Sequence, residues 1–228
     1  MSGAPLHATE PTAAPRLAQV LDALRLQASP AQRDQLLRYL ALLQRWNRVY
    51  NLTAVRDPGD MLTLHVADSL ALLPALDRRA PHRVLDLGSG GGLPGLVLAI
   101  MRPHWQLVLV EAVQKKCAFL RQVAALLQLP QVQVEHARAE QLRLPGVDCI
   151  VSRAVAELAE LVRISEHLLL PGGAWAVMKG QDPQAELQAL GPTLRHHVEP
   201  LQVPGLDARR CVVWIEYPAS TSHASRIS

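Results

Sequence analysis

The chain has 228 residues, of which 49% are hydrophobic and 19% are charged, and its formal net charge is +3. This composition excludes a mostly disordered chain, which would be poor in apolar residues and strongly charged, and no apolar run approaches the roughly 20 residues of a membrane-spanning helix. The N-terminus lacks the pattern of a secretory signal, and the three cysteines form no C-x-x-C pair, so we expect a cytoplasmic protein without disulfides, a bound metal or a membrane partner.

The two ends of the chain, residues 1–16 and residues 219–228, consist mostly of small and polar residues without an apolar period. Such segments rarely stay ordered unless they are tied to a core. We therefore expect a disordered N-terminus and a disordered C-terminal tail.

Residues 17–80 are predicted to form a helical N-terminal subdomain. The tetrapeptide Ser29–Gln32 has the sequence S-P-A-Q, which is typical of a helix N-terminus with proline in the first turn and a capping box. Behind it, apolar residues recur every three or four positions, as on one face of a helix. A second start signal at Asp57 opens another helix, which Pro74 and the region of Pro81 are expected to close.

From residue 81 on, short apolar runs alternate with segments of helix length. The expected strands are 84–87, 107–110, 132–134, 149–151 and 174–178, and the expected helices between them are 96–101, 115–127, 155–170 and 184–190. Strands without polar alternation that are separated by helices indicate a parallel sheet covered on both faces. The last two runs, 198–203 and 211–216, have only a loop between them and should pair antiparallel. Residues 81–218 are thus predicted to be an α/β domain with a mostly parallel seven-stranded sheet and an antiparallel final strand.

A glycine-rich loop follows the first predicted strand. The segment Asp86–Gly95 has the sequence D-L-G-S-G-G-G-L-P-G, with five glycines in its last eight residues. In open α/β sheets ligands bind outside the carboxyl ends of the strands, and glycine lets the backbone approach a ligand closely. A mere tight turn would need only one or two glycines. We therefore predict a ligand-binding loop, with Gly88, Gly90 and Gly92 against the ligand.

The residues around this loop distinguish between two classes of ligand. Gly90, Gly92 and Gly95 have the G-x-G-x-x-G spacing of dinucleotide-binding loops, and Glu111 ends the second strand, where a carboxylate binds ribose hydroxyls. Proline at the next helix start removes an N–H donor that a pyrophosphate needs. Asp86 would repel a pyrophosphate but would attract an ammonium group. These features favour S-adenosylmethionine, held by Asp86, the glycines and Glu111, over NAD. An oxidoreductase that uses a dinucleotide stays the alternative.

The chain resembles the RsmG (GidB) family of bacterial methyltransferases, which modify N7 of one guanosine (guanine-527) in the 530 loop of 16S rRNA. The matching motifs are W-N-x-x-Y-N-L-T at 46–53, R-D-P at 56–58, H-x-x-D-S at 65–69, the glycine loop at 86–95, K-K-x-x-F-L at 115–120, R-A-E at 138–140, S-R-A at 152–154 and K-G at 179–180. They follow the family's order over roughly residues 20–217.

The resemblance implies a Rossmann-like class I methyltransferase fold with a helical N-terminal cap, and S-adenosylmethionine as cofactor. The partner would be 16S rRNA, in the small ribosomal subunit or in an assembly intermediate, and we expect the protein to be a monomer. The implied cofactor contacts lie at Gly88, Leu93, Ala139, Glu140 and Arg153. Another S-adenosylmethionine-dependent methyltransferase and a non-catalytic assembly factor remain alternatives.

The chemistry of this reaction needs few catalytic side chains. N7 of guanine has a lone pair and no proton, so its attack on a sulfonium methyl requires no general base, and catalysis rests on proximity and orientation. Arg153, at the end of the fourth strand, is the candidate for orientation. It would bind the methionyl carboxylate of the cofactor, or else the guanine or its phosphate. Cys149 falls inside the fourth strand, which indicates a core residue rather than a nucleophile.

Several further residues are candidates for contact with the substrate. His65, Asp68 and Ser69 share one helix face, where they could close the pocket over the base or hold the helix to the sheet. Lys115 and Lys116 begin a helix at the ligand edge of the sheet and could bind phosphates, although a solvated charge run is the alternative. Lys179, which ends the fifth strand, is the last candidate.

Overall fold

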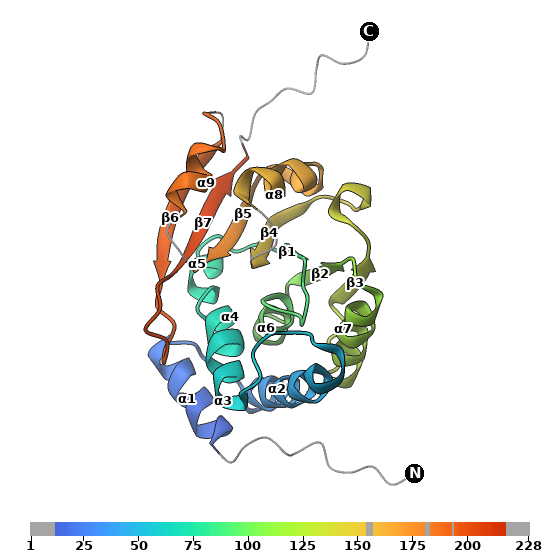
Figure 1. Cartoon of the computed structure of the whole chain (residues 1–228), viewed down its shortest axis with the longest axis vertical. Coiled ribbons are helices and arrows are strands. Elements are labelled where there is room, and N and C mark those ends of the chain that lie inside the picture. The colour runs from blue at the N-terminus through green and yellow to red at the C-terminus, as the bar shows by residue number, and fades with distance from the viewer. Residues whose placement is uncertain (1–11, 154–156, 181–182, 193, 218–228) are drawn as a thin grey trace.

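A seven-stranded sheet forms the centre of the computed structural model, which describes residues 12–153, 157–180, 183–192 and 194–217 (Figure 1). The strands are β1 (Arg83–Leu87), β2 (Gln106–Glu111), β3 (Val132–His136), β4 (Val147–Arg153), β5 (Leu169–Lys179), β6 (Arg195–Leu201) and β7 (Arg210–Glu216). Their order is β3-β2-β1-β4-β5-β7-β6, and neighbouring strands are parallel except where β7 pairs with β5 and β6. The predicted sheet, with its antiparallel final strand, is confirmed.

Helical segments cover both faces of this sheet (Figure 1). The segments are α1 (Ala13–Ala23), α2 (Pro30–Tyr50), α3 (Pro58–Met61), the π-helix η1 (Leu62–Ala67), α4 (Asp68–Leu70), α5 (Leu73–Asp77), α6 (Gly95–Met101), α7 (Gln114–Leu126), η2 (Ala139–Gln141), α8 (Leu158–Ser165), η3 (Glu166–Leu168) and α9 (Gln184–Gln188). Because strand side chains alternate between the faces, Leu109 and Val151 pack with α1–α7, whereas Leu85 and Ile150 pack with α8 and α9. The N-terminal helices therefore share one core with the sheet.

The local start signals of the N-terminal helices have the predicted structure. Ser29 Oγ accepts a hydrogen bond from Gln32 N at 3.2 Å, and Gln32 Oε1 accepts one from Ser29 N at 2.9 Å, which is a complete capping box. Asp57 caps α3 with a single bond, in which its Oδ1 accepts from Asp60 N at 2.8 Å. The helix that follows does not run to Pro74. It passes through the π-helix η1 and ends at Leu70, so that Pro74 lies in the first turn of α5.

Several predicted boundaries were wrong. The helix expected over 155–170 ends earlier, because α8 ends at Ser165, η3 ends at Leu168 and residues 169–170 belong to β5. Helix α1 begins at Ala13, because its apolar side packs into the core, so residues 13–16 are not disordered. Strand β5 begins at Leu169 rather than at 174, because Leu169 is buried and pairs with Val147 in β4. The register between the two strands shifts between the pairs Val147–Leu169 and Cys149–Ala174, where β5 carries the extra residues. The expected disorder of residues 1–11 and 219–228 falls outside the described residues.

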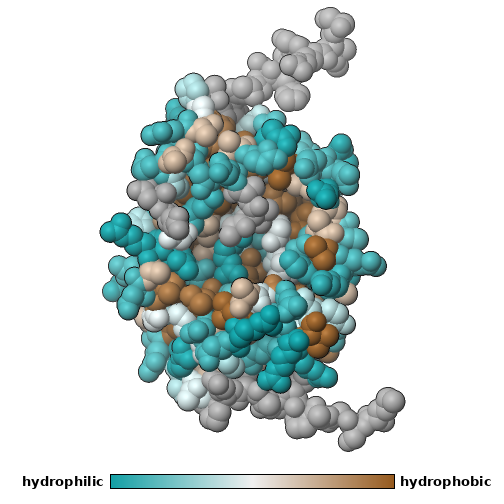
Figure 2. Space-filling view, in the orientation of Figure 1, coloured by the Kyte–Doolittle hydropathy of each residue, from teal (hydrophilic) through white to brown (hydrophobic). Residues whose placement is uncertain are grey.

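The surface seen in Figure 2 is mostly hydrophilic, and hydrophobic residues gather in a band across the middle of this face. In Figure 1 the carboxyl ends of the parallel strands meet the N-terminal helices at this level. In the described part of the chain, no helix combines the length and the apolar character needed to cross a bilayer.

Candidate active site

The glycine loop connects β1 to α6 at the carboxyl end of the sheet. Gly88, Gly90 and Gly92 have positive φ angles of 73°, 56° and 89°, a backbone region that favours glycine. A Cβ atom added to Gly90 would meet only the Gly88 carbonyl oxygen, at 3.8 Å. The loop backbone at Gly90 thus faces open space, where a ligand could approach it. Leu93 is buried in the core.

Asp86 lies fully buried beneath this loop. Its Oδ2 accepts a hydrogen bond from Gly95 N, the first residue of α6, at 3.0 Å. A Cβ atom on Gly95 would come within 2.6 Å of the same oxygen, so the close approach requires glycine. Among buried side-chain nitrogen and oxygen atoms of the described residues, Asp86 Oδ1 alone lacks a hydrogen-bond partner. Burial raises the pKa of Asp86 to about 7, against the opposing effect of the Gly95 hydrogen bond.

Glu111 ends β2 beside the loop, as predicted. Its Oε2 accepts from Gly90 N at 3.0 Å, and its Oε1 accepts from Val113 N at 2.8 Å. The side chain therefore supports the loop from the neighbouring strand. Each carboxylate oxygen has capacity for a further hydrogen bond, which a ribose hydroxyl could donate.

Tyr39 of α2 also holds the glycine loop, although no motif in the sequence singled it out. Its hydroxyl donates a hydrogen bond to the Gly91 carbonyl oxygen at 2.7 Å in a fully buried position. Burial raises the pKa of the phenol well above its usual range, so the hydroxyl keeps its proton. The only feature of the sequence that could have indicated this role is the position of Tyr39 on the apolar face of a predicted helix.

The short helix η2 follows β3 at the same edge of the sheet. Ala139 is buried and Glu140 is exposed. Their predicted contact with the cofactor stays a prediction.

A second group of side chains centres on Asp68, at the start of α4. Asp68 Oδ2 lies 3.3 Å from Arg153 Nη1, and its Oδ1 accepts from Arg210 Nε at 3.1 Å. The aspartate is almost fully buried, whereas each arginine side chain is about one-fifth exposed. One carboxylate thus connects arginines from two strands, at the end of β4 and the start of β7. Nothing in the sequence pattern pointed to Arg210.

His65 of η1 belongs to the same group. Its Nε2 lies 2.8 Å from Thr53 Oγ1, and its Nδ1 lies 3.5 Å from Arg153 Nη2. Burial lowers its pKa to about 4, and the positive charge of Arg153 adds to the effect, so the imidazole is neutral at pH 7. A guanidinium can only donate, so Nδ1 accepts and Nε2 carries the proton toward Thr53.

These side chains line a cavity of about 410 Å³ between η1, α4 and the carboxyl ends of β4 and β5. The structure thereby brings together four of the predicted residues, namely His65, Asp68, Arg153 and Lys179. Lys179 is held by both carboxylate oxygens of Glu186, at 2.9 and 2.7 Å. Ser69 does not line the cavity, because its buried hydroxyl donates to the His65 carbonyl oxygen within the helix.

The remaining candidates lie elsewhere. Lys115 and Lys116 are in the first turn of α7, where the first is exposed and the second is half-buried. Contact of these two with phosphates stays a prediction. Cys149 is buried in β4, and burial raises its thiol pKa to about 12, so its interpretation as a core residue is confirmed. Within the described ranges, no three His, Cys, Asp or Glu side chains form a group that could hold a metal ion.

The motif at residues 46–53 is structural in its contacts. Asn47 is buried, its Nδ2 donates to the Val55 carbonyl oxygen at 2.9 Å, and its Oδ1 accepts from Thr53 N at 2.8 Å. Trp46 packs against Phe119 of α7, with ring centroids 5.4 Å apart. The motif thus fixes the loop in which Thr53 contacts the imidazole of His65.

Comparison with known proteins identifies relatives across most of the chain. Residues 32–213 match the family model GidB, described as rRNA small subunit methyltransferase G. Curated relatives named Ribosomal RNA small subunit methyltransferase G include one from Leptothrix cholodnii, 54% identical over 85% of this chain and 90% of its own. Another, from Bordetella pertussis, is 49% identical over 89% of this chain and 92% of its own.

Solved structures with a similar fold include several methyltransferases. TrmN from Thermus thermophilus has a TM-score of 0.51 and 27% identity, over 65% of this chain and 48% of its own. An O-methyltransferase from Bacillus cereus, solved in complex with SAH, has a TM-score of 0.56 over 89% of this chain and 97% of its own. Its 16% identity supports the Rossmann-like methyltransferase fold alone.

Proposed function

Since this chain belongs to the GidB family of rRNA small subunit methyltransferases G, we propose that it transfers a methyl group from S-adenosylmethionine to N7 of a guanosine in the 530 loop of 16S rRNA. The observation that carries the proposal is the extent of the family match. Residues 32–213 include the glycine loop, Glu111 and the arginine pair held by Asp68. The family relatives are themselves named for methylation of small-subunit rRNA.

The loop fits S-adenosylmethionine better than a dinucleotide. Gly90 leaves open space in front of its backbone, and Glu111 stands where ribose hydroxyls would bind. The carboxyl of Asp86, buried beneath the loop with Oδ1 unpartnered, would attract an ammonium group through its negative charge. A pyrophosphate would instead need the N–H donor at the start of α6, which Gly95 already gives to Asp86. When bound, S-adenosylmethionine supplies a sulfonium methyl that is open to attack by a lone pair.

The side chains of the adjoining cavity suit an acceptor atom that carries no proton. Both nitrogens of neutral His65 already have partners, Thr53 and Arg153, and both oxygens of Asp68 face guanidinium groups. None of these groups is set up to remove a proton from a substrate. Guanine N7 needs no such removal, so the chain would act by binding and orienting the base.

Arg153 is positioned to orient one of the two reactants. The Leu64 carbonyl oxygen, Asp68 and His65 fix its guanidinium at the end of β4, and 23% of its side chain stays exposed. It would hold the methionyl carboxylate of the cofactor or the target guanine. We propose further that the substrate is 16S rRNA in the small subunit or an assembly intermediate, and that the protein acts as a monomer.

Calorimetry with S-adenosylmethionine and with NAD tests the cofactor, and transfer of labelled methyl to 16S rRNA tests the reaction. We expect S-adenosylmethionine to bind, NAD not to bind, and the label to appear as 7-methylguanosine. Binding of NAD alone would support an oxidoreductase. Binding to small subunits without any transfer would support an assembly factor.

A further inference from the structure

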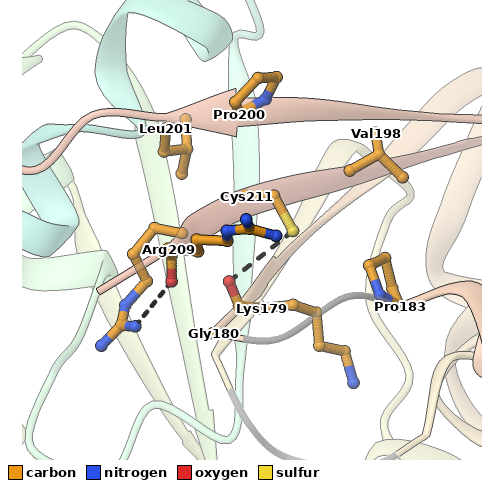
Figure 3. A pocket seen from close by; sticks show the side chains of 9 residues that line it. Lys179, Gly180, Pro183, Val198, Pro200, Leu201, Arg209 and Cys211 are labelled. Carbon is orange, nitrogen blue, oxygen red and sulfur yellow. Dashed lines mark hydrogen bonds between the residues drawn. The ribbon is translucent and has the colours of Figure 1, made fainter. Parts of the chain in front are cut away.

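A second cavity, of about 500 Å³, opens beside the one that Asp68 and Arg153 line, and the two share Lys179, Gly180 and Arg210. Figure 3 shows Val198, Pro200 and Leu201 of β6 along one side of it. Lys179 and Pro183 lie on the opposite side, and Arg209 and Cys211 lie between the two (Figure 3). The cavity therefore adjoins the site of the proposed reaction and reaches outward to the edge strand of the sheet.

The strand order places cationic side chains in a row along this edge. Strands β4 and β5 end at Arg153 and Lys179, and β7, which runs in the opposite direction, begins at Arg210. Arg209 directly precedes β7. Because neighbouring strands lie about 4.8 Å apart, the row leads stepwise from the first cavity into the second.

The row keeps an excess of positive charge. Asp68 neutralises part of the charge of Arg153 and Arg210, and Glu186 is paired with Lys179. Arg209 is exposed, and its side chain has no carboxylate partner among the described residues. An anionic ligand could therefore bind Arg209 without breaking an existing ion pair.

The side of the cavity that β6 forms is apolar. Val198 is 37% exposed although it is a large apolar residue, and Pro200 and Leu201 continue the apolar side next to it. An apolar wall facing cationic side chains matches a nucleotide, whose base has flat apolar faces and whose phosphate is anionic. Single-stranded RNA loops are bound in this manner, with bases splayed onto the protein.

We propose that this cavity binds a nucleotide adjacent to the methylated guanosine, with its phosphate on Arg209 and its base against Val198 and Pro200. The inference rests on the proposed function, because it assigns the second cavity to the same RNA strand. It makes Arg209 a binding residue that contributes to substrate affinity rather than to the methyl transfer itself.

Arg209→Ala tests the phosphate contact, and Arg195→Ala is the matched control, because Arg195 is exposed at the opposite end of β6. Affinity for an RNA hairpin carrying the 530 loop is measured by fluorescence polarisation over a range of salt concentrations. We expect Arg209→Ala to raise Kd about tenfold and to reduce the slope of log Kd against log salt by about 0.7, the loss of one single-strand phosphate contact. Arg195→Ala should change neither value. An unchanged slope in Arg209→Ala would overturn the proposal.

Val198→Asp tests the base contact from the other wall, since it places a negative charge on the apolar surface at an exposed position. It should raise KM for the hairpin about tenfold, while kcat, the melting temperature and the affinity for S-adenosylmethionine stay unchanged. Unchanged KM in a folded variant would contradict the proposed place of the base.

Cross-linking separates this proposal from the proposed function. RNA hairpins that carry 4-thiouridine one nucleotide before or after the target guanosine are bound to the full-length protein and irradiated. The cross-linked residues are then identified by mass spectrometry. We expect adducts within residues 198–201 or 209–211. If the protein methylates the hairpin but the cross-links form only at other residues, or do not form, the cavity assignment alone is overturned. If the wild-type protein does not methylate the hairpin, the proposed function is contradicted.

Discussion

The carboxylate of Glu111 accepts a hydrogen bond from the backbone N–H of Gly90 at 3.0 Å, which joins the end of β2 to the glycine loop after β1. The adjacent strands are in register at Leu87 and Val110, so Glu111 comes directly after the last residue of β2 that pairs with β1, and Gly90 lies in the loop that follows the last paired residue of β1. A ligand held by Glu111 would therefore also contact a loop of fixed position. Three side chains support this loop, namely Glu111, Asp86 and Tyr39.

Glu111→Gln should weaken S-adenosylmethionine binding by about tenfold or more. The amide group would turn one N–H donor toward a backbone donor, Gly90 N or Val113 N, and would lose the charge-assisted bonds to the ribose. Calorimetry measures the affinity. Glu166→Gln, an exposed change outside the site, is the control, and equal affinities in the two variants would contradict the ribose contact.

Tyr39→Phe should lower the free energy of unfolding by about 1–3 kcal/mol, because it leaves the buried Gly91 carbonyl oxygen without its partner. The loosened loop should also bind the cofactor less tightly. Urea denaturation measures the stability change. Tyr50→Phe, at a partly exposed position, should have no such effect. A wild-type-like Tyr39→Phe protein would show that the hydroxyl does not support the loop.

Asp86 should make stability depend on pH in a definite direction. Burial raises the pKa of its carboxyl from its ordinary value of 3.8 to about 7, so the folded state binds this proton more tightly than the unfolded chain. The stabilisation is complete below about pH 4 and is lost as the pH rises to about 7, on the order of 1 kcal/mol per pH unit. Subtracting the pH profile of Asp86→Asn from that of the wild type should isolate this slope. Asp207→Asn, a substitution at an exposed position, should leave this pH slope intact. If the difference between the wild-type and Asp86→Asn profiles showed no slope, the result would contradict the account.

The same carboxyl provides a test of the cofactor contact. An ammonium group beside Asp86 Oδ1 would favour the ionised carboxylate, so cofactor binding at pH 6.5 should release protons. Calorimetry in two buffers of different ionisation enthalpy measures this release. Asp86→Asn should bind without it. Binding by the wild type without proton release would argue against the contact with the ammonium group.

Arg153→Ala should reduce methyl transfer more than tenfold and leave the melting temperature nearly unchanged. Asp68 would keep its ion pair with Arg210, so no buried charge would be left without a partner. Activity assays and thermal unfolding measure the two effects, with the exposed Arg163→Ala as control. A variant that merely unfolds, or one that keeps full activity, would contradict the orienting role.

The sequence predicted the features that depend on local pattern. The apolar runs located all seven strands, and the glycine loop and Glu111 follow from their places directly after β1 and at the end of β2. The start of β5 was misplaced, because Pro171–Gly173 suggests a loop and only pairing with β4 makes the segment a strand.

Features that depend on distant contacts were not predictable in this way. Arg210 reaches Asp68 because the antiparallel return of β7 places its first residue beside the end of β5, a contact between residues 142 positions apart. The position of Tyr39 on the apolar face of its helix indicates only a core residue, and the structure is needed to show that its hydroxyl donates a hydrogen bond to the Gly91 carbonyl oxygen. Such contacts follow from the topology and not from sequence spacing.

Aniline cleavage after borohydride reduction reports 7-methylguanosine in rRNA directly, and it tests the central claim in the cell. In a strain that carries this gene, 16S rRNA should be cleaved at one guanosine of the 530 loop. Deletion of the gene should abolish the cleavage, and a plasmid with the wild-type gene, but not with Glu111→Gln combined with Arg153→Ala, should restore it. Cleavage that persists in the deletion strain would contradict the account.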